Sequence, residues 1–152
     1  MKILIIDIET TGFLLQDGRI VELDLETIDK RIVFDKVINP QLDKSVIEAS
    51  WIIKNGYMTI GEIQAGILFE EIKSEFQKLL NNYPDGATAF NRSFDFDFLE
   101  SYGIVFPKKL PCPMLLSTNI CKLPKTYKNP QHFDYGGHKW PKVEEAYKFL
   151  YP

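Results

Sequence analysis

The chain has 152 residues, of which 45% are hydrophobic and 26% are charged, as in a globular protein with one core. This composition excludes a membrane-spanning protein, because no apolar stretch reaches the roughly 18 residues of a membrane span. The opening lacks a basic region followed by a cleavage site, which predicts a cytoplasmic protein.

The charge is unevenly distributed along the chain, with a net value of −3. Residues 1–107 contain 10 Lys and Arg against 18 Asp and Glu, whereas residues 108–152 contain 8 Lys against 3 acids. The basic final third could form a local phosphate-binding face, although solvated lysines explain the pattern equally well. The cysteines Cys112 and Cys121 form no metal-binding pair and are expected to be reduced thiols. We expect a single domain over residues 1–152.

The first 40 residues predict an antiparallel meander of three strands. Residues 2–9 are apolar on both faces, which is typical of a central strand in a sheet that is covered on both sides. Residues 20–28 alternate in hydropathy, which predicts a half-exposed strand. Its expected core-facing residues are Val21, Leu23 and Leu25, and its expected water-facing residues are Glu22, Asp24 and Glu26. Residues 31–38 predict the third strand.

The rest of the chain predicts helices and one further strand. Apolar residues recur there at helical spacing, with glycine or proline near the expected ends. The expected elements are helices over residues 45–55, 66–82, 93–102, 115–123 and 141–151, a strand over residues 87–91, and loops over residues 107–113 and 123–137. This order predicts a mixed α/β fold with helices on both faces of the sheet.

The stretch DIETTG, residues 7–12, places two carboxylates at the end of the first strand. Asp7 and Glu9 are two residues apart, so both side chains leave the same face of a strand, with Cα atoms about 6.5–7 Å apart. Two like charges this close raise each other's pKa unless a cation lies between them. Such oxygen ligands suit Mg²⁺ or Mn²⁺. From these two residues alone, a metal site and a solvated pair are equally compatible with the pattern.

Two further stretches carry residues that could join this pair. In TAFNRSFDFDFLE, residues 88–100, a short strand runs into a helix whose first turn carries Asp95, although the helix dipole alone favours an acid there. In GGHKWPKVEEAY, residues 136–147, His138 precedes a helix whose first turns carry Glu144 and Glu145. Together these residues form a ligand set for two divalent ions and a base that titrates near neutral pH.

The order DIETTG, NRSFDFDFL and HKWPKVEEAY resembles the three exonuclease motifs of the DnaQ-like DEDDh 3′-5′ exonucleases. This family includes the proofreading subunit of the bacterial replicative polymerase and the oligoribonucleases. The resemblance spans nearly the whole chain and is closest in the first two motifs. It implies a ribonuclease H-like fold, in which a mixed five-stranded sheet, made of an antiparallel three-strand meander plus parallel strands, is flanked by helices.

The third motif departs from the family pattern of His, four residues and Asp. The fifth residue after His138 is Val143, which cannot bind a metal. Aligning the helix through VEEA puts Glu145 in the position of the Asp and Trp140 in that of the His. Glu144 is then the competing ligand. His138 on a flexible loop, His132 or no histidine at all could serve as the base.

The resemblance implies a two-metal 3′-5′ exonuclease that releases nucleoside 5′-monophosphates from single-stranded nucleic acid, with DNA favoured over RNA. The implied ligands of two Mg²⁺ or Mn²⁺ ions are Asp7, Glu9, Asp95 and Glu145, and the implied general base is His138. The implied contacts to the 3′-terminal nucleotide are Thr10, Thr11, Gly12, Asn91 and Phe94, although Phe94 also fits plain core packing. The lysines of residues 122–142 could follow the nucleic-acid backbone, and a polymerase is a candidate partner.

Two other functions stay open from the sequence. The departure in the third motif favours a catalytically impaired module that keeps the fold and binds nucleic acid or a protein partner. A different metal-dependent phosphodiesterase could carry the same acidic cluster. The sequence leaves the oligomeric state open.

Overall fold

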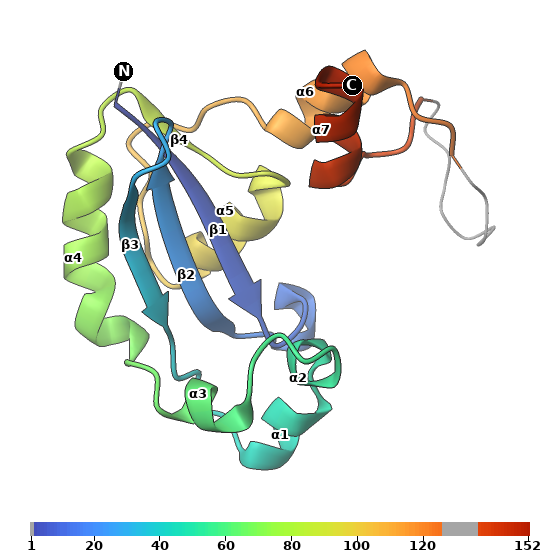
Figure 1. Cartoon of the computed structure of the whole chain (residues 1–152). Helices are drawn as coiled ribbons and strands as arrows, with labels where there is room; N and C mark the ends of the chain where they lie inside the picture. The colour runs from blue at the N-terminus through green and yellow to red at the C-terminus, as the bar shows by residue number, and fades with distance from the viewer. Residues whose placement is uncertain (1, 126–136) are drawn as a thin grey trace.

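Three strands from the first 40 residues and one short strand near residue 87 form a mixed sheet in the order β3-β2-β1-β4 (Figure 1). The computed structural model describes residues 2–125 and 137–152. The strands are β1 (Ile3–Thr10), β2 (Ile20–Thr27), β3 (Ile32–Val37) and β4 (Gly86–Thr88). The pairs β1–β2 and β2–β3 are antiparallel, and β1–β4 is parallel. The predicted meander and the mixed α/β class are confirmed.

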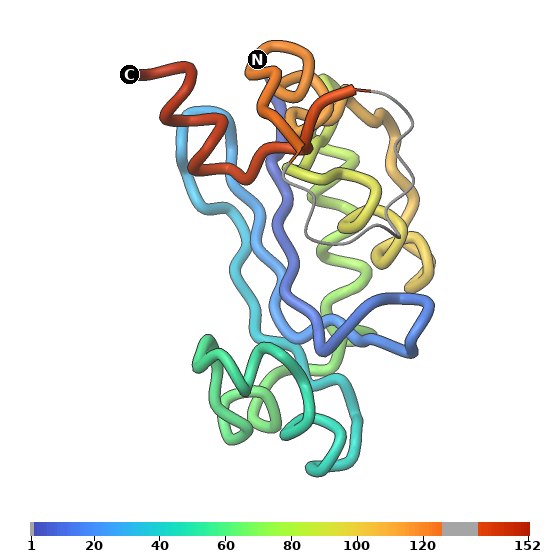
Figure 2. Tube along the Cα trace, turned by 90° about the vertical axis from the view of Figure 1, so that its right-hand side faces the viewer, coloured from blue at the N-terminus to red at the C-terminus, as the bar shows by residue number. Residues whose placement is uncertain are grey.

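One face of the sheet forms the main core, because alternate side chains of its strands point into a layer of helices. Leu4, Ile6 and Ile8 of β1 are buried in this layer, as are Leu23 and Leu25 of β2. Helices α4 (Phe69–Asn81) and α5 (Arg92–Ser101) cover this face. Figure 2 shows both helices, in green and yellow, on the same side of the strands.

The opposite face of the sheet is open along the middle of β1. Ile5 is 40% exposed on this face, and Asp7 is exposed beside it. The expectation that residues 2–9 are covered on both faces is therefore wrong. The reason is that the neighbouring residues of β2 on this face, Glu22, Asp24 and Glu26, are acids, and an apolar layer cannot cover unpaired carboxylates without a large cost in desolvation.

A second, smaller apolar cluster lies below the sheet in Figure 1, around α1 (Lys44–Ala49), α2 (Trp51–Lys54) and α3 (Ile60–Gln64). The single helix expected over residues 45–55 is divided in two at Ser50. This residue has an extended backbone, and its buried hydroxyl donates to the Ile47 carbonyl over 2.5 Å. Serine competes with helical hydrogen bonding in this way. Between β1 and β2 lies a short 3-10 helix, η1 (Leu14–Gln16).

The segment after α5, which includes the loop expected over residues 107–113, runs beside β4. The Ala87 N–H donates to the Lys108 carbonyl, and the Leu110 N–H donates to the Ala87 carbonyl. The pairing ends there, because Pro107 and Pro111 flank it and proline has no N–H to donate to a ladder. The described residues therefore form four strands, and the expected five-stranded sheet is corrected to four.

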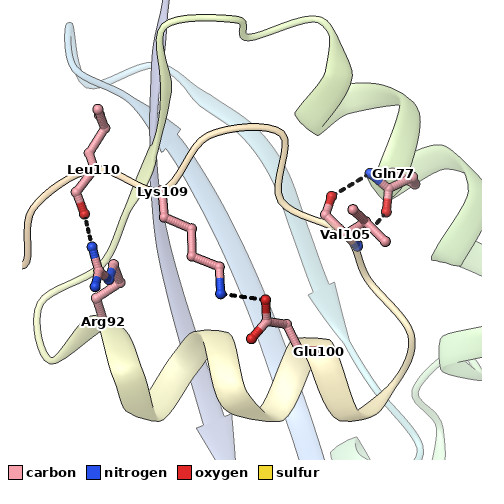
Figure 3. Close-up of polar contacts among 6 residues, drawn as sticks. All are labelled: Gln77, Arg92, Glu100, Val105, Lys109 and Leu110. Carbon is pink, nitrogen blue, oxygen red and sulfur yellow. Dashed lines mark hydrogen bonds and ion pairs between the residues drawn. The ribbon is translucent and has the colours of Figure 1, made fainter.

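Polar contacts hold this segment against the two core helices (Figure 3). The Gln77 side chain of α4 donates to the Val105 carbonyl (2.7 Å) and accepts from the Val105 N–H (2.9 Å). Lys109 Nζ lies 2.5 Å from Glu100 Oε1 on α5. The segment therefore fixes the place at which the next helix begins.

The remaining two helices, α6 (Pro113–Cys121) and α7 (Val143–Leu150), form what we call the C-terminal helix pair. It lies beyond the β4 edge, at the end of the sheet where β1 begins (Figure 1), and α7 packs mainly against α6. Both helices were expected, but α7 begins later than predicted because Pro141 precedes its N-cap. Within the described ranges, no helix is long and apolar enough to cross a membrane.

Candidate active site

The first two acids of the expected site lie on the open face of β1. Asp7 is exposed and Glu9 is half-buried. Partial burial, and then the charge of Glu26, raise the pKa of Asp7. Partial burial, and then the charges of Asp7 and Glu22, raise the pKa of Glu9. A cation between the two carboxylates would reverse both shifts, because it favours the ionised form of each.

The first turn of α5 brings Asp95 to the same strand. Asp95 is only 3% exposed, and its Oδ1 accepts a hydrogen bond of 3.2 Å from the Ile8 N–H. This N–H is available because the pairing of β4 with β1 ends at Thr88, opposite Ile5. Burial, and then the charge of Asp7, raise the pKa of Asp95 to about 8, although the Ile8 hydrogen bond acts in the opposite direction. Asp95 therefore interacts electrostatically with both acids of β1.

A sharp connection between β4 and α5 sets the position of Asp95. Asn91, the N-cap of α5, has φ 71° and ψ 46°, in the left-handed region that asparagine adopts more readily than most residues. Its carbonyl accepts from the Phe94 N–H over 2.9 Å. Asn91 therefore has a clear role in the turn, and its contact with a nucleotide stays a prediction.

A row of carboxylates crosses the open face beside Asp7. The sequence alone placed Asp24 on a water-facing side and did not identify Asp35. The strand register puts Asp7 opposite Asp24, and Asp24 opposite Asp35. Burial, followed by the charges of Glu22 and Asp35, raises the pKa of Asp24 to about 7. Periodicity within one strand could not reveal this row, because the register between strands creates it.

The row borders a hollow of about 300 Å³, which we call the sheet-face hollow. Its lining residues are Ile5, Asp7, Asp24, Glu26, Ile32 and Asp35. Among the residues that the structure describes, no Lys or Arg forms an ion pair with any of these four acids or with Glu9. Within the described residues, the open face therefore concentrates negative charge that no ion pair offsets.

Two aromatic rings come from α5 and from the loop that follows the TTG turn. Phe94, half-buried on α5, meets Phe98 with ring centroids 5.2 Å apart and Phe13 with centroids 6.3 Å apart, edge to face. Phe13 directly follows the TTG turn and is 65% exposed. Phe94 thus joins the core cluster at its margin, while Phe13 offers a free aromatic face that the sequence analysis did not identify. The sequence signal that could have identified Phe13 is an aromatic residue directly after the DIETTG motif.

The TTG turn is held by hydrogen bonds of its own. The Thr10 hydroxyl donates to the Gly12 carbonyl (2.8 Å), and the Thr11 hydroxyl accepts from the Arg19 N–H (2.9 Å). A Cβ on Gly18 would lie 2.3 Å from the Gly12 carbonyl oxygen, so the returning chain passes too close for any other residue. Both hydroxyls are therefore engaged within the turn, whereas a Cβ on Gly12 would meet nothing within 4 Å.

The residues of the third motif lie elsewhere. Glu145 Oε1 lies 2.5 Å from Lys139 Nζ, and its Oε2 accepts from the Lys142 N–H over 2.8 Å. The Lys139 side chain, and then the Lys142 N–H, lower the pKa of Glu145. This carboxylate caps its own helix, so the structure does not bring Glu145 to Asp7, Glu9 and Asp95.

The other candidates of the third motif are also on the surface. His138 and Glu144 are exposed, and Trp140 is 62% exposed. His132, the alternative base, lies outside the described residues. Because α7 stands at the end of the sheet where β1 begins, while Glu9 lies near the end of β1, the described structure does not join the third motif to the first two.

The donor chemistry of the three joined acids fits a divalent cation. Three carboxylates repel one another around one strand, and each has a raised pKa. Within residues 2–125 and 137–152, however, no three acid, histidine or cysteine side chains already stand close enough together to hold a metal ion. Side-chain rotation of the exposed Asp7 and the half-buried Glu9 would have to complete such a site.

Comparison of the chain with models of known protein families found no match, and a search of curated proteins found no significant relative. The case for a function therefore rests on the residues and their arrangement.

Proposed function

We propose that the protein is a divalent-metal-dependent 3′-5′ exonuclease that acts on the 3′ end of single-stranded nucleic acid. The observation that supports this most is the position of Asp95. Asp95 lies on α5, 86 residues after Glu9 in the chain, and is almost fully buried. It accepts a hydrogen bond from the Ile8 N–H of β1, between Asp7 and Glu9. Ionising a carboxylate that is buried beside two others is costly, and a cation that joined the group would offset this cost.

In this proposal Asp7, Glu9 and Asp95 hold Mg²⁺ or Mn²⁺. The ions would supply positive charge where an attacking and a leaving oxygen of a phosphodiester become negative. The protein itself would position the 3′ end of the nucleic acid. Phe13 would stack on the terminal base, and the space at Gly12 would admit the sugar close to the backbone.

The resemblance to the ribonuclease H-like exonucleases adds to the proposal. The antiparallel meander and the parallel fourth strand agree with part of the sheet that this resemblance implies, while the described sheet has four strands in place of five. In the proposed enzyme His138 is the general base and Glu145 or Glu144 the fourth ligand. These roles require the C-terminal helix pair to approach the acids when a substrate binds.

A strand-degradation assay tests the function. A 5′-labelled single-stranded DNA, incubated with the protein and Mn²⁺, should shorten stepwise, and a matched RNA should shorten more slowly. Asp7→Asn should lower the rate by more than about 100-fold, the upper end for changes around metal ligands. Asp97→Asn is the matched control, because Asp97 is an exposed acid on the same helix as Asp95. Equal activity of Asp7→Asn and wild type would contradict the proposal.

A catalytically impaired module that binds nucleic acid or a protein is the second candidate. The capping of α7 by Glu145 favours it, because that carboxylate is already occupied by Lys139. Such a module would bind the labelled strand in the presence of Mn²⁺ and leave its length unchanged.

A further inference from the structure

The end of the sheet at which β1 begins holds a cavity of about 630 Å³. Figure 1 shows that the start of β1, the turn between β2 and β3, and the end of α4 lie together at this end. All three line the cavity, which we call the turn cavity, and its polar and aromatic lining residues are Lys2, Thr27, Asp29, Arg31, Asn82 and Tyr83. Its volume lies within the range of small-molecule sites, and none of its lining residues belongs to the proposed active site.

Hydrogen bonds fix the walls of the turn cavity. The Thr27 N–H donates to the Arg31 carbonyl over 2.9 Å, and the Thr27 hydroxyl accepts from the Arg31 N–H over 3.1 Å, which closes the turn between β2 and β3. The Lys2 N–H donates to Asp85 Oδ2 over 2.6 Å, which ties the start of β1 to the turn after α4. The cavity is therefore formed before a ligand binds, and this lowers the entropic cost of binding.

Two cations line the turn cavity. Lys2 and Arg31 are both exposed, and neither side chain forms an ion pair with a described residue. They differ from their surroundings, because residues 1–107 contain 10 Lys and Arg against 18 Asp and Glu. A guanidinium and an ammonium at one site bind a phosphate group well, since the planar guanidinium donates two parallel hydrogen bonds to phosphate oxygens.

A carboxylate in the same cavity favours a ligand that carries more than a phosphate. The Thr27 side chain, and then the Asp29 N–H, lower the pKa of Asp29, so this carboxylate is ionised at neutral pH. An ionised carboxylate only accepts hydrogen bonds, so it repels a bare anion but binds the hydroxyls of a sugar. A sugar phosphate therefore satisfies both the cations and Asp29.

An aromatic ring and an amide complete the lining. Tyr83 is half-buried and packs against the main core, while Asn82 is exposed and its side-chain amide is hydrogen-bonded to no described residue. Aromatic side chains stack with every nucleobase, and an amide both donates to and accepts from the edge of a base. A base, a ribose and a phosphate together use all of these groups.

We propose that the turn cavity binds a ribonucleoside monophosphate. Lys2 and Arg31 bind its phosphate, Asp29 accepts hydrogen bonds from its ribose hydroxyls, and its base stacks on Tyr83. The cavity lies at the opposite end of β1 from Glu9. The site needs no metal ion and does not depend on the proposed nuclease activity.

Isothermal titration calorimetry of the full chain with adenosine 5′-monophosphate, in EDTA to remove divalent metal, tests the proposal. The wild type should bind the nucleotide. Arg31→Gln and Lys2→Gln should each weaken binding by about tenfold or more, because each removes a charge-assisted hydrogen bond. Both should keep the wild-type melting temperature, since both side chains are exposed. Lys30→Gln is the matched control, because Lys30 is an exposed cation of the same turn that does not line the cavity. A wild type that does not bind overturns the proposal, as do equal losses in Lys30→Gln and Arg31→Gln, which general charge attraction would explain.

Two further ligands test which parts of the nucleotide are recognised. Inorganic phosphate and 2′-deoxyadenosine 5′-monophosphate should each bind at least about tenfold more weakly than the ribonucleotide, since each lacks a hydroxyl for Asp29. Asp29→Asn should reduce the difference between the two nucleotides. Either ligand binding as tightly as the ribonucleotide overturns the proposal. A negative result here leaves the strand-degradation assay unaffected, because that assay depends on Mn²⁺ and this one excludes it.

Discussion

Asp24 lies directly opposite Asp7 in the antiparallel ladder between β1 and β2. Like charges in directly opposite positions destabilise a sheet, and here Asp35 continues the row on β3. Repulsion between these carboxylates therefore destabilises the open face of the sheet at neutral pH. Protons, a divalent cation or a basic partner would each relieve it.

The first prediction is that acid stabilises the fold through Asp24 on this face and through the buried Asp95 of α5. The folded-state pKa values of Asp24 (about 7) and Asp95 (about 8) are raised from 3.8, so the folded chain binds more protons than the unfolded chain between about pH 4 and pH 8. Their stabilising contribution is complete below pH 4 and is lost as the pH rises through 7 to 8. Urea unfolding from pH 5 to pH 9 should show a falling free energy of unfolding.

Asp24→Asn isolates the row in the same measurement. The amide keeps the shape and removes one charge, so the variant should be more stable than wild type at pH 8 and should depend less on pH. Asp97→Asn should reproduce the wild-type slope. If the free energy of unfolding of Asp24→Asn depends on pH as in the wild type, the ionisation of Asp24 does not destabilise the folded chain.

The second prediction concerns the turn after β1. Gly18→Ala places a Cβ 2.3 Å from the Gly12 carbonyl oxygen, whereas Gly12→Ala meets nothing within 4 Å. The first change should destabilise the fold by about 1–3 kcal/mol, the range for overpacking, and the second should change stability little. Thermal unfolding measures the stability of both variants, and equal melting temperatures would contradict the described loop.

The antiparallel meander could be predicted because period-2 alternation is a local property of the chain. The division of the 45–55 helix at Ser50 was missed, because helical spacing continues across a serine whose hydroxyl bonds backward to Ile47. The fifth strand was expected from the resemblance alone, which gave it no position in the sequence. The segment that pairs with Ala87 is flanked by the prolines at 107 and 111, which prevent a full ladder.

The site was predictable only in part, for a similar reason. Asp7, Glu9 and Asp95 could be found because each belongs to a compact motif. The row through Asp24 and Asp35 depends on strand register. Glu145 was assigned by motif position, but Lys139, only six residues away, occupies its carboxylate. Local ion pairing of this kind cannot be read from a motif.

The third prediction separates the two glutamates of α7 and assumes the proposed nuclease. If α7 brings its acids to the active site, Glu145→Gln should abolish strand shortening and Glu144→Gln should retain most of it. The opposite result would move the ligand to Glu144. If both variants remain fully active, the third motif has no role in hydrolysis, as its present position on the surface would require.

The fourth prediction concerns the exposed ring of Phe13, which directly follows the TTG turn. Phe13→Ala should weaken binding of a single-stranded oligonucleotide by about 1–3 kcal/mol, the value of one base–aromatic stack. Fluorescence anisotropy in an Asp7→Asn background avoids degradation of the strand. Leu15→Ala is the control, because Leu15 is a fully exposed apolar residue of the same loop. Equal losses in both variants would mean that only general apolar contact is involved.

The cation site is the central claim, and crystals soaked in Mn²⁺ test it most directly. The anomalous difference map should show a peak between Asp7, Glu9 and Asp95, and the peak should disappear in Asp95→Asn. A map without a peak beside Asp7, from crystals in which all three carboxylates are ordered, would contradict the account.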